Sequence, residues 1–376
     1  MSVSVVIPTR DKALRLRLTL ACLADTEPAG YLTEVVVVDD GSVDATAEVL
    51  AEAAERLPLR VVAGGGRGRA GARNLGAEHA GGDLLVFLDD DVLVGPGFVG
   101  GHRARSRPDR FVHGRLRELP AADHLVRTLD GAPYPEVREA RDLIHGGRSS
   151  HPRHRLKANA LERAIEAMHG GDLPDAVPWL GCVGANVSMP RALWERVGGF
   201  DAGFGEVWGC EDLELGLRLY EAGARRDLAP DALGVHLTHR RPSRWDEHAT
   251  NMNRFAALHP VPAVRELPYL LSASGDPSTY ITRVLTAARL TTPPAPTVPS
   301  APPAGSHLAG PPVAGSASAP AGPPPPSLTT GPAPTVPVLA DPAAASAPTG
   351  PTSTAAPHHS GPHPVAPAAG PAPDAS

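Results

Sequence analysis

The run LLVFLDDD at residues 84–91 joins five consecutive apolar residues to three adjacent carboxylates. An uninterrupted apolar run of this length predicts a β-strand that is buried on both faces of a sheet. Asp89, Asp90 and Asp91 follow directly, and neighbouring carboxylates repel one another unless a cation or hydrogen bonds offset the repulsion. The pattern therefore indicates either a metal site or an acidic turn that caps a helix.

Short β-branched runs alternate with helical patterns on the N-terminal side of this strand. Strands are predicted at residues 3–7, 35–38 and 59–62, and helices at residues 14–23, 44–56 and 71–79. This alternation predicts an α/β fold with a mostly parallel central sheet and flanking helices. Ligands of such sheets bind beyond the carboxyl ends of the strands, so the residues after each strand are candidates for a binding site.

Polar or glycine-rich residues follow the other three predicted strands. They are Pro8, Thr9 and Arg10 after the first, Asp39, Asp40, Gly41 and Ser42 after the second, and residues 64–68 after the third. Taken singly, the second group is typical of a turn and cap, and the third lacks the Lys-Ser/Thr ending of a phosphate loop. Arg69, Arg73 and Asn74 come next and are candidates for binding a diphosphate or a base.

Composition separates a foldable region from a tail. Residues 293–376 contain 25 prolines, no Phe, Trp or Tyr, and no Lys or Arg, which predicts disorder. The remaining residues carry 35 basic and 39 acidic side chains, and this near-balance does not indicate a nucleic-acid binder.

Cysteine usage and the first residues favour a cytoplasmic protein. Cys22, Cys182 and Cys210 are odd in number and widely spaced, unlike a disulfide framework or a zinc knuckle. A strand-like run follows Met1 at once, unlike a signal peptide, and no apolar stretch reaches the ~18 residues of a membrane helix. We therefore expect a lipid-linked substrate, if used, to be reached peripherally from the inner face of the membrane.

The second half of the chain is less regular. Residues 100–178 are rich in Arg and His with weak periodicity, and a helix is predicted there at residues 158–169. Further elements are predicted beyond this region: a strand at residues 183–189, helices at residues 191–197 and 211–222, and one or two accessory helices within residues 240–292.

Four segments together closely resemble family 2 glycosyltransferases. They are VVIPTR at residues 5–10, VVDDGSVDAT at residues 37–46, ARNLG at residues 72–76 and FLDDD at residues 87–91. Their order and spacing make the resemblance specific, and it covers about residues 2–240 with a poor match in the middle. It implies a GT-A fold, a nucleoside-diphosphate sugar donor and an inverting reaction.

The resemblance also implies a donor site and a metal. By that likeness Thr9, Asp39 and Arg73 hold the nucleotide, Asp89 and Asp91 form an Asp-x-Asp motif, and Asp91 is the closer ligand of Mn²⁺ or Mg²⁺. A UDP-sugar is the expected donor. The complete set predicted for the donor is Pro8, Thr9, Arg10, Asp39, Asp40, Arg73, Asn74, Asp89 and Asp90.

A second motif, WGCEDLELGLRL at residues 208–219, resembles the acceptor side of galactosyltransferase-like members of this superfamily. In those proteins a Glu-Asp pair opens a helix under the acceptor, which implies that Asp212 is the general base with Glu211 beside it. The alternative is a favourable charge pattern in a first helical turn, where acidic residues are common.

Acceptor residues are predicted around this base. Trp208 is expected to stack on a sugar face, and Gly184 and Asn186 to contact the acceptor, a hydroxyl-bearing glycan or lipid-linked glycan. Cys210 stands where the resembling proteins tend to carry glycine, which leaves the shape of the acceptor open.

A histidine is predicted to complete the metal site. His236 and His239 follow a strand-like segment, and in the resembling families a histidine in this region often binds the metal. We favour His236, so that the predicted ligands are Asp91, Asp89 and His236.

The sequence thus predicts a catalytic domain at residues 1–262, with a nucleotide-sugar half at residues 1–100 and an acceptor half at residues 179–240. An accessory helical segment at residues 263–292 and the tail at residues 293–376 follow. The predicted activity is an inverting, metal-dependent hexosyl transfer to a hydroxyl, in cell-surface polysaccharide, glycolipid or natural-product glycosylation.

Two alternatives remain open. A sugar-nucleotide pyrophosphorylase uses a related sheet and carboxylate-bound metal, although its first strand would be followed by a glycine-rich triphosphate loop. A non-catalytic scaffold would act through the tail, where prolines such as those at residues 323–326 favour the extended helix that aromatic grooves recognise.

Overall fold

The computed structural model describes most of the first 291 residues of the chain. The described residues are 1–26, 31–120, 122–129, 132–135, 137–145, 155–238, 244–272 and 274–291. The predicted tail at residues 293–376 and the candidate ligand His239 lie outside them.

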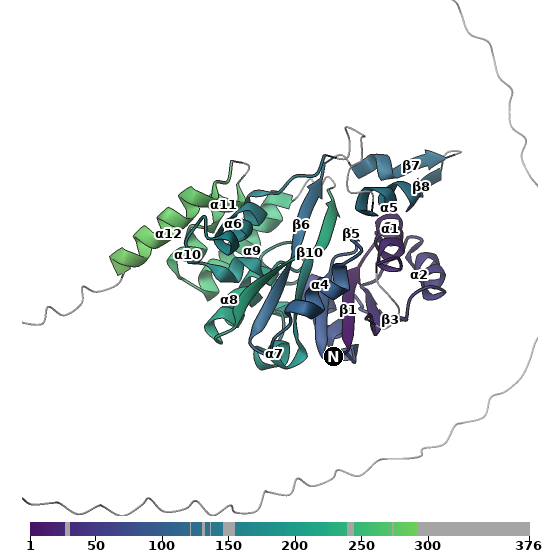
Figure 1. The fold of residues 1–376 in the computed structure, drawn as a ribbon, viewed down its shortest axis with the longest axis horizontal. Coiled ribbons are helices and arrows are strands. Elements are labelled where there is room, and N and C mark those ends of the chain that lie inside the picture. Colours follow the sequence, from purple (N-terminus) through teal and green to yellow (C-terminus); the bar gives the residue numbers. More distant parts are fainter. Residues whose placement is uncertain are drawn as a thin grey trace, which may run out of the picture. The chain divides into compact units, whose positions relative to one another are not determined.

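An eight-stranded sheet crosses the centre of the described region (Figure 1). Its strands are β1 (Val3–Thr9), β2 (Glu34–Asp39), β3 (Leu59–Ala63), β4 (Leu84–Leu88), β5 (Val92–Val94), β6 (Arg110–Leu119), β9 (Asn186–Pro190) and β10 (Arg225–Leu237). The strand order is β3-β2-β1-β4-β9-β6-β10-β5, and β5 and β9 run antiparallel to their neighbours while the other pairs are parallel. The predicted mostly parallel sheet is confirmed. A hairpin of β7 (Val126–Leu129) and β8 (Ala132–Pro135) is separate from this sheet.

The strands of the sheet differ in burial. Every residue of β1 and β4 is buried, as their continuous apolar runs predict. Burial on both faces does not extend to β3, where Arg60 interrupts the apolar run and both Arg60 and Val61 are exposed.

Helices cover both faces of the sheet. The apolar cluster on one face includes side chains from α1 (Ala13–Leu23), α2 (Thr46–Ala54), α4 (Phe98–Arg105) and α5 (Val137–His145). The cluster on the other face includes side chains from α3 (Gly68–His79), α7 (Arg191–Arg196) and α8 (Glu211–Glu221). Short 3₁₀ turns occur at η1 (Ala122–Leu125), η3 (Pro178–Gly181) and η4 (Ala202–Phe204).

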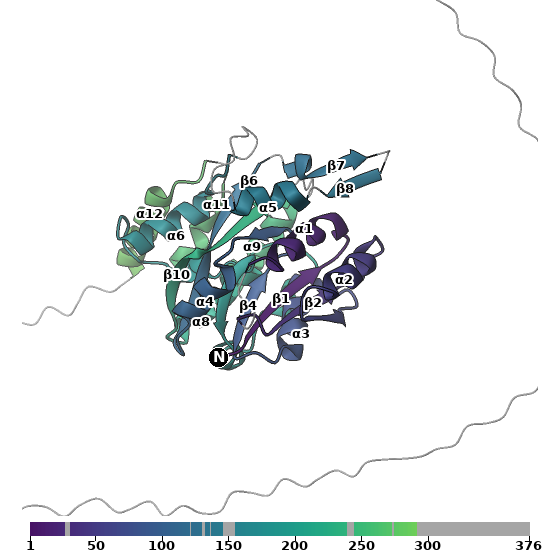
Figure 2. The ribbon, with the colours of Figure 1, turned by 45° about the vertical axis from the view of Figure 1, so that its right-hand side comes forward.

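A third apolar cluster joins the C-terminal helices to the rest of the fold. It includes side chains from α6 (Ala160–Gly170), α8, α9 (Arg244–Leu258), α10 (Pro262–Arg265), α11 (Leu267–Leu271) and α12 (Pro277–Thr291). Figures 1 and 2 show α6, α11 and α12 grouped together, away from α1 and α2. One or two helices were expected within residues 240–292, whereas the described residues form four. The difference arises because the prolines at the starts of α10 and α11 divide the segment.

Two simpler expectations concern cysteines and membranes. Cys22, Cys182 and Cys210 are all buried and free, in agreement with the absence of a predicted disulfide framework. None of the helices in the described part of the chain is both long and apolar enough to cross a membrane.

Candidate active site

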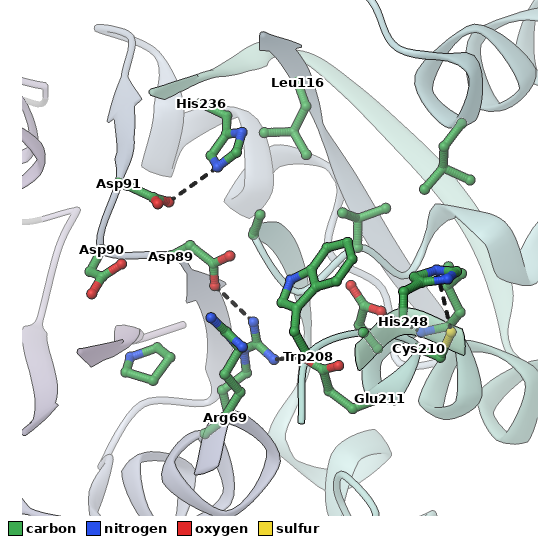
Figure 3. Close-up of a pocket in the computed structure, with 18 of the residues that line it drawn as sticks. Arg69, Asp89, Asp90, Asp91, Leu116, Trp208, Cys210, Glu211, His236 and His248 are labelled. Atoms are coloured by element: carbon green, nitrogen blue, oxygen red, sulfur yellow. Dashed lines mark hydrogen bonds and ion pairs between the residues drawn. The ribbon is translucent and has the colours of Figure 1, made fainter. Parts of the chain in front are cut away.

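A cavity of about 710 Å³ lies where the carboxyl ends of the central strands meet the start of α8 (Figure 3). It brings together most of the predicted residues from both halves of the chain. These are Pro8, Thr9, Arg10, Asp40, Arg73, Asp89, Asp90, Asp91, Trp208, Glu211, Asp212 and His236. The donor-side and acceptor-side motifs, more than a hundred residues apart in the sequence, therefore face one space.

Arg73 connects the two sides of this cavity from beneath. Its guanidinium donates from Nη2 to Asp89 Oδ1 at 2.7 Å and from Nη1 to Glu211 Oε1 at 2.9 Å. The arginine is 2% exposed, and although burial opposes it, the charges of Asp89 and Glu211 raise its pKa. Gly184 allows this position, because a Cβ there would lie 2.8 Å from the guanidinium carbon. Arg73 thus fixes the position of Asp89, which belongs to the donor-side motif, relative to Glu211, which belongs to the acceptor-side motif.

Asp212 lies in the first turn of α8, where its surroundings favour the protonated, neutral form of its carboxyl group. Burial and the negative charge of Glu211 raise its pKa to about 6, against the opposing charge of Arg73. Its Oδ2 accepts from the Gly184 backbone N–H at 2.9 Å, and its Oδ1 from the Leu213 N–H at 2.8 Å. A carboxylate with this proton affinity is suited to accept a proton from a hydroxyl near neutral pH.

Asp91 and His236 form an ion pair that also lines the cavity. The His236 Nε2 lies 3.4 Å from Asp91 Oδ1, and its Nδ1 lies 2.8 Å from Glu118 Oε2. Burial opposes protonation, but Asp91 and Glu118 raise the pKa of His236 to about 10. Burial likewise opposes ionisation of Glu118, yet the hydrogen bond from His236 and its charge lower the pKa of Glu118 to about 2. Thr238 adds a hydrogen bond to the same carboxylate oxygen at 2.7 Å.

The carboxylate of Asp91 also pairs with a lysine. Lys12 Nζ lies 2.6 Å from Asp91 Oδ2 and 3.5 Å from Asp90 Oδ1. The Oδ2 of Asp90 accepts a hydrogen bond from the Thr9 hydroxyl at 2.8 Å, so this carboxylate is turned away from His236. Burial raises the pKa of Asp90. The three carboxylates of the acidic triplet therefore have different partners: Asp89 faces Arg73, Asp90 faces Thr9, and Asp91 faces Lys12 and His236.

The residues present fit a divalent ion at Asp91 and His236. A carboxylate oxygen and an imidazole nitrogen 3.4 Å apart can be ligands of one ion, and a carboxylate behind the imidazole is the usual means of orienting a metal-binding histidine. A mixed oxygen and nitrogen set suits Mn²⁺ better than Mg²⁺. Asp89 is held by Arg73 in this structure, and among the described residues no group of three or more His, Cys, Asp or Glu side chains is arranged for metal binding.

Four predicted residues do not line the cavity. Gly184 lies just behind it, against Arg73 and Asp212. Asp39 accepts from the Ser42 N–H at 2.8 Å and so shapes its own turn. Asn74 exchanges two hydrogen bonds of 2.8 Å with the backbone of residue 200.

Asn186 belongs to a buried polar network. Its side chain is fully buried; its Oδ1 accepts from His102 Nε2 at 2.8 Å, and its Nδ2 donates to the Ala232 carbonyl at 2.9 Å. Burial lowers the pKa of His102 to about 4, so the imidazole is neutral, and its Nε2–H donates to the amide oxygen. The contacts of Asn186 are those of a core residue that links β9 to α4 and β10.

The donor end of the cavity has accessible cations. Arg69, at the start of α3, lines the cavity and is partly exposed, whereas the guanidinium of Arg73 is buried against carboxylates. Asp40 accepts from the Arg67 and Gly68 N–H groups at 2.7 and 2.8 Å, which fixes the loop before α3. At the rim, Arg10 pairs with Glu206 at 3.2 Å between two exposed side chains.

Lys12, Glu118 and His248 are among the cavity residues that were missed from the sequence. Lys12 had a usable signal, since it closely follows the first strand in the segment PTRDK. Glu118 lies in the irregular middle region and reaches His236 through the pairing of β6 with β10. His248 lies on α9, and nothing in its sequence neighbourhood distinguishes it from a surface histidine.

Comparison with known proteins adds two family matches. Residues 4–109 match the family described as Glycosyl transferase family 2, and residues 176–242 match the N-terminal domain of galactosyltransferase. A validoxylamine A glucosyltransferase from Streptomyces hygroscopicus subsp. jinggangensis is 32% identical over 281 residues, which is 68% of this chain and 61% of that protein. A chondroitin synthase from Escherichia coli is 28% identical over 240 residues, 62% of this chain and 34% of that protein. The chain thus spans less than two thirds of either relative.

Solved structures with a similar course of the chain share little sequence with it. A mannosyltransferase from Pyrobaculum calidifontis in complex with GDP-Man and Mn²⁺ superposes with a TM-score of 0.47 at 23% identity, over 77% of this chain and 76% of that one. GalNAc-T7 with UDP, GalNAc and Mn²⁺ gives a TM-score of 0.49 at 18% identity, over 77% of this chain and 54% of that one.

Proposed function

Residues 4–109 of the chain belong to glycosyl transferase family 2 and the chain has the GT-A fold, and from this premise we propose that it transfers a sugar from a nucleoside-diphosphate donor to an acceptor hydroxyl with inversion. The observation that carries the proposal is the meeting of Asp212 with the Asp91–His236 pair in one cavity. A base for the acceptor and a cation site for the leaving diphosphate are the two groups that such a transfer needs.

The proposed reaction is a single displacement at the anomeric carbon. The acceptor oxygen attacks that carbon from the face opposite the diphosphate, and its proton passes to a carboxylate oxygen of Asp212. The bond from the anomeric carbon to the diphosphate oxygen breaks, and the electron pair leaves with the nucleoside diphosphate. Attack from the opposite face inverts the configuration.

Arg69 and Arg73 have different tasks in this proposal. Arg69 is accessible in the cavity, so we assign it a direct contact with the diphosphate, where a cation stabilises the charge of the leaving group. Arg73 is buried and bound to Asp89 and Glu211, so we assign it the positioning of these carboxylates. Thr9 and Asp90, joined by a hydrogen bond of 2.8 Å, also line the cavity.

Asp91 and His236 would hold a divalent ion, with Mn²⁺ favoured by the nitrogen ligand. Such an ion, when bound, neutralises charge on the departing diphosphate. Glu118 fixes the ring of His236 so that Nε2 faces Asp91. Lys12 supplies a further positive charge beside Asp91 at 2.6 Å.

The nature of the sugar and of the acceptor follows from the relatives and is part of the proposal. The similarity to a validoxylamine A glucosyltransferase makes UDP-glucose the first donor to test and natural-product glycosylation the first pathway class.

The test measures release of nucleoside diphosphate by the full chain from a panel of UDP- and GDP-sugars with Mn²⁺. We expect Asp212→Asn to lower turnover at least about a hundredfold, because the amide cannot accept the proton. Binding of UDP, measured by calorimetry, should change less than about twofold, since Asp212 lies on the acceptor side. Asp172→Asn, an exposed carboxylate outside the cavity, is the matched control.

Two results would contradict the proposal. Normal turnover by the Asp212→Asn variant would remove the base assignment. Release of pyrophosphate from a nucleoside triphosphate and a sugar phosphate, without release of diphosphate from any nucleotide sugar, would show a pyrophosphorylase instead.

A further inference from the structure

The loop at residues 201–210 and helix α9 are fastened together at several points. Asn251 donates to the Val207 carbonyl at 2.8 Å, and Arg254 pairs with Asp201 at 2.7 Å. The Arg254 guanidinium also lies over the Phe204 ring, 5.3 Å from its centroid. This loop carries Trp208 and leads directly into α8, so α9 fixes the approach to Glu211 and Asp212.

His248 projects from α9 against Trp208 (Figure 3). The two ring centroids lie 5.4 Å apart with their planes tilted by 41°, and both side chains line the cavity. Gly209 permits this closeness, since its φ is +110° and a Cβ on it would lie 3.0 Å from His248 Cδ2. The aromatic surface at this end of the cavity is therefore made by two residues, Trp208 and His248.

Cys210 holds the other edge of the imidazole. Its Sγ lies 3.8 Å from His248 Nε2 and 3.6 Å from Met252 Sδ, and Figure 3 shows the sulfur beside the ring. Cys210 is one of two described non-glycine residues with positive φ, at 70°, a conformation that glycine would adopt with less strain. The cysteine side chain fills the space between α8 and α9, a contact that glycine at this position would not make.

The surface formed by Trp208 and His248 lies close to the proposed base. Cys210 precedes Glu211 and Asp212, so the Trp208–His248 surface adjoins the start of the helix that carries the proposed base. A ring that bears hydroxyl groups has an apolar C–H face, and such faces pack on aromatic side chains. An acceptor lying on this surface would present a hydroxyl toward Asp212.

We propose that His248 is an acceptor-binding residue that forms one wall with Trp208, and that this wall takes a saturated, polyhydroxylated ring such as a sugar or a cyclitol. The proposal rests on the proposed glycosyl transfer and adds to it the class of acceptor. His248 contributes the surface of its ring, and Cys210 and Met252 set its position.

The experiment follows UDP release from UDP-glucose with Mn²⁺ by the full chain while methyl β-D-glucopyranoside or myo-inositol is titrated as acceptor. In His248→Ala we expect the acceptor KM to rise about tenfold, the upper range for a lost aromatic contact, while kcat and the donor KM stay within about twofold. In His248→Phe the ring is kept, so the acceptor KM should return to within about threefold of the original value. Thr250→Ala, an exposed residue of the same helix, is the control and should behave like the unaltered protein.

The outcomes separate the two proposals. An unchanged acceptor KM in His248→Ala, or an equal fall of kcat in the Ala and Phe variants, would overturn the acceptor role of His248. A protein that binds UDP and slowly hydrolyses UDP-glucose, yet is not accelerated by either ring compound, would overturn the acceptor class alone. A protein that binds no nucleoside diphosphate and releases none would contradict the transferase itself.

Discussion

Asp89 and Asp212 show how one residue type acquires two proton affinities in one cavity. Both are influenced by Arg73, but they differ in which charge lies closest. Burial opposes ionisation of Asp89, and direct pairing with Arg73 lowers its pKa. For Asp212, burial and the neighbouring Glu211 raise the pKa, and Arg73 offsets them only in part. Paired carboxylates with divergent pKa values are typical of sites where one group stays charged and another exchanges protons.

This difference predicts the pH dependence of the reaction. Asp212 must be ionised to act as a base, and its pKa is raised to about 6, so activity should fall as the pH drops through 6. With saturating Mn²⁺, kcat/KM for the acceptor should rise about tenfold between pH 5 and pH 7 and then level off. The measurement is a pH series of UDP release, with UDP affinity determined at each pH to separate donor binding from catalysis. A flat profile across this range at constant UDP affinity would exclude Asp212 as the titrating base.

At the level of secondary structure, the pairing of β6 with β10 brings Glu118 and His236 together. The register places Glu118 opposite His236, after an irregularity between Ala229 and Gly234. Without that irregularity the register beyond Gly234 would differ, and another β6 residue would stand opposite His236. The strand pairing thus determines which carboxylate orients the imidazole.

Loss of the Glu118 charge is therefore expected to weaken metal binding. In Glu118→Gln the side chain keeps its shape but loses the charge that orients and polarises His236, so Mn²⁺ affinity should fall about tenfold. Calorimetric titration of Mn²⁺ in the presence of UDP measures this directly. Glu55→Gln, which alters an exposed carboxylate outside the cavity, should leave the affinity unchanged. Equal affinities for the unaltered protein and Glu118→Gln would argue against an ion at His236.

At the level of the whole molecule, the C-terminal helices complete both the core and the cavity. Their side chains join α6 and α8 in the third apolar cluster, and Leu270, Leu271 and Ser272 line the cavity. The described residues through Thr291 fall within one compact unit, Met1–Pro299. The accessory segment predicted from the sequence thus contributes to the same site as the catalytic motifs.

Two truncations test this arrangement. A chain that ends at Pro299 should keep its melting temperature within about 2 °C and its rate of UDP release, because the three apolar clusters and the cavity precede that residue. A chain that ends at Pro262 should fail to fold stably. It loses six buried apolar side chains, each worth about 1.5–3 kcal/mol, against a total stability of about 5–15 kcal/mol. Thermal unfolding followed by circular dichroism decides both cases, and a stable, active chain ending at Pro262 would contradict the shared core.

The sequence by itself predicted the buried strands of the sheet, a resemblance to family 2 glycosyltransferases and most of the cavity residues. Continuous apolar runs such as residues 84–88 specify buried strands locally, and the polar residues after parallel strands must meet at one edge. For that reason the sequence predicts Asp89 and Asp91 at this edge, while the family resemblance implies that Arg73 joins them, and the family match at residues 4–109 agrees with the four segments quoted.

The tertiary structure alone decided the partners of these residues. That Asp89 faces Arg73 while Asp91 faces His236, that Glu118 lies behind the imidazole, and that Asn186 joins a core network all depend on strand order and register. His248 and Cys210 meet because α9 packs on the loop before α8. The sequence pattern of neither segment predicts this contact. The periodicity of apolar residues in the sequence predicts which face of a helix or strand is buried. Which residues contact that face depends on how the whole chain packs.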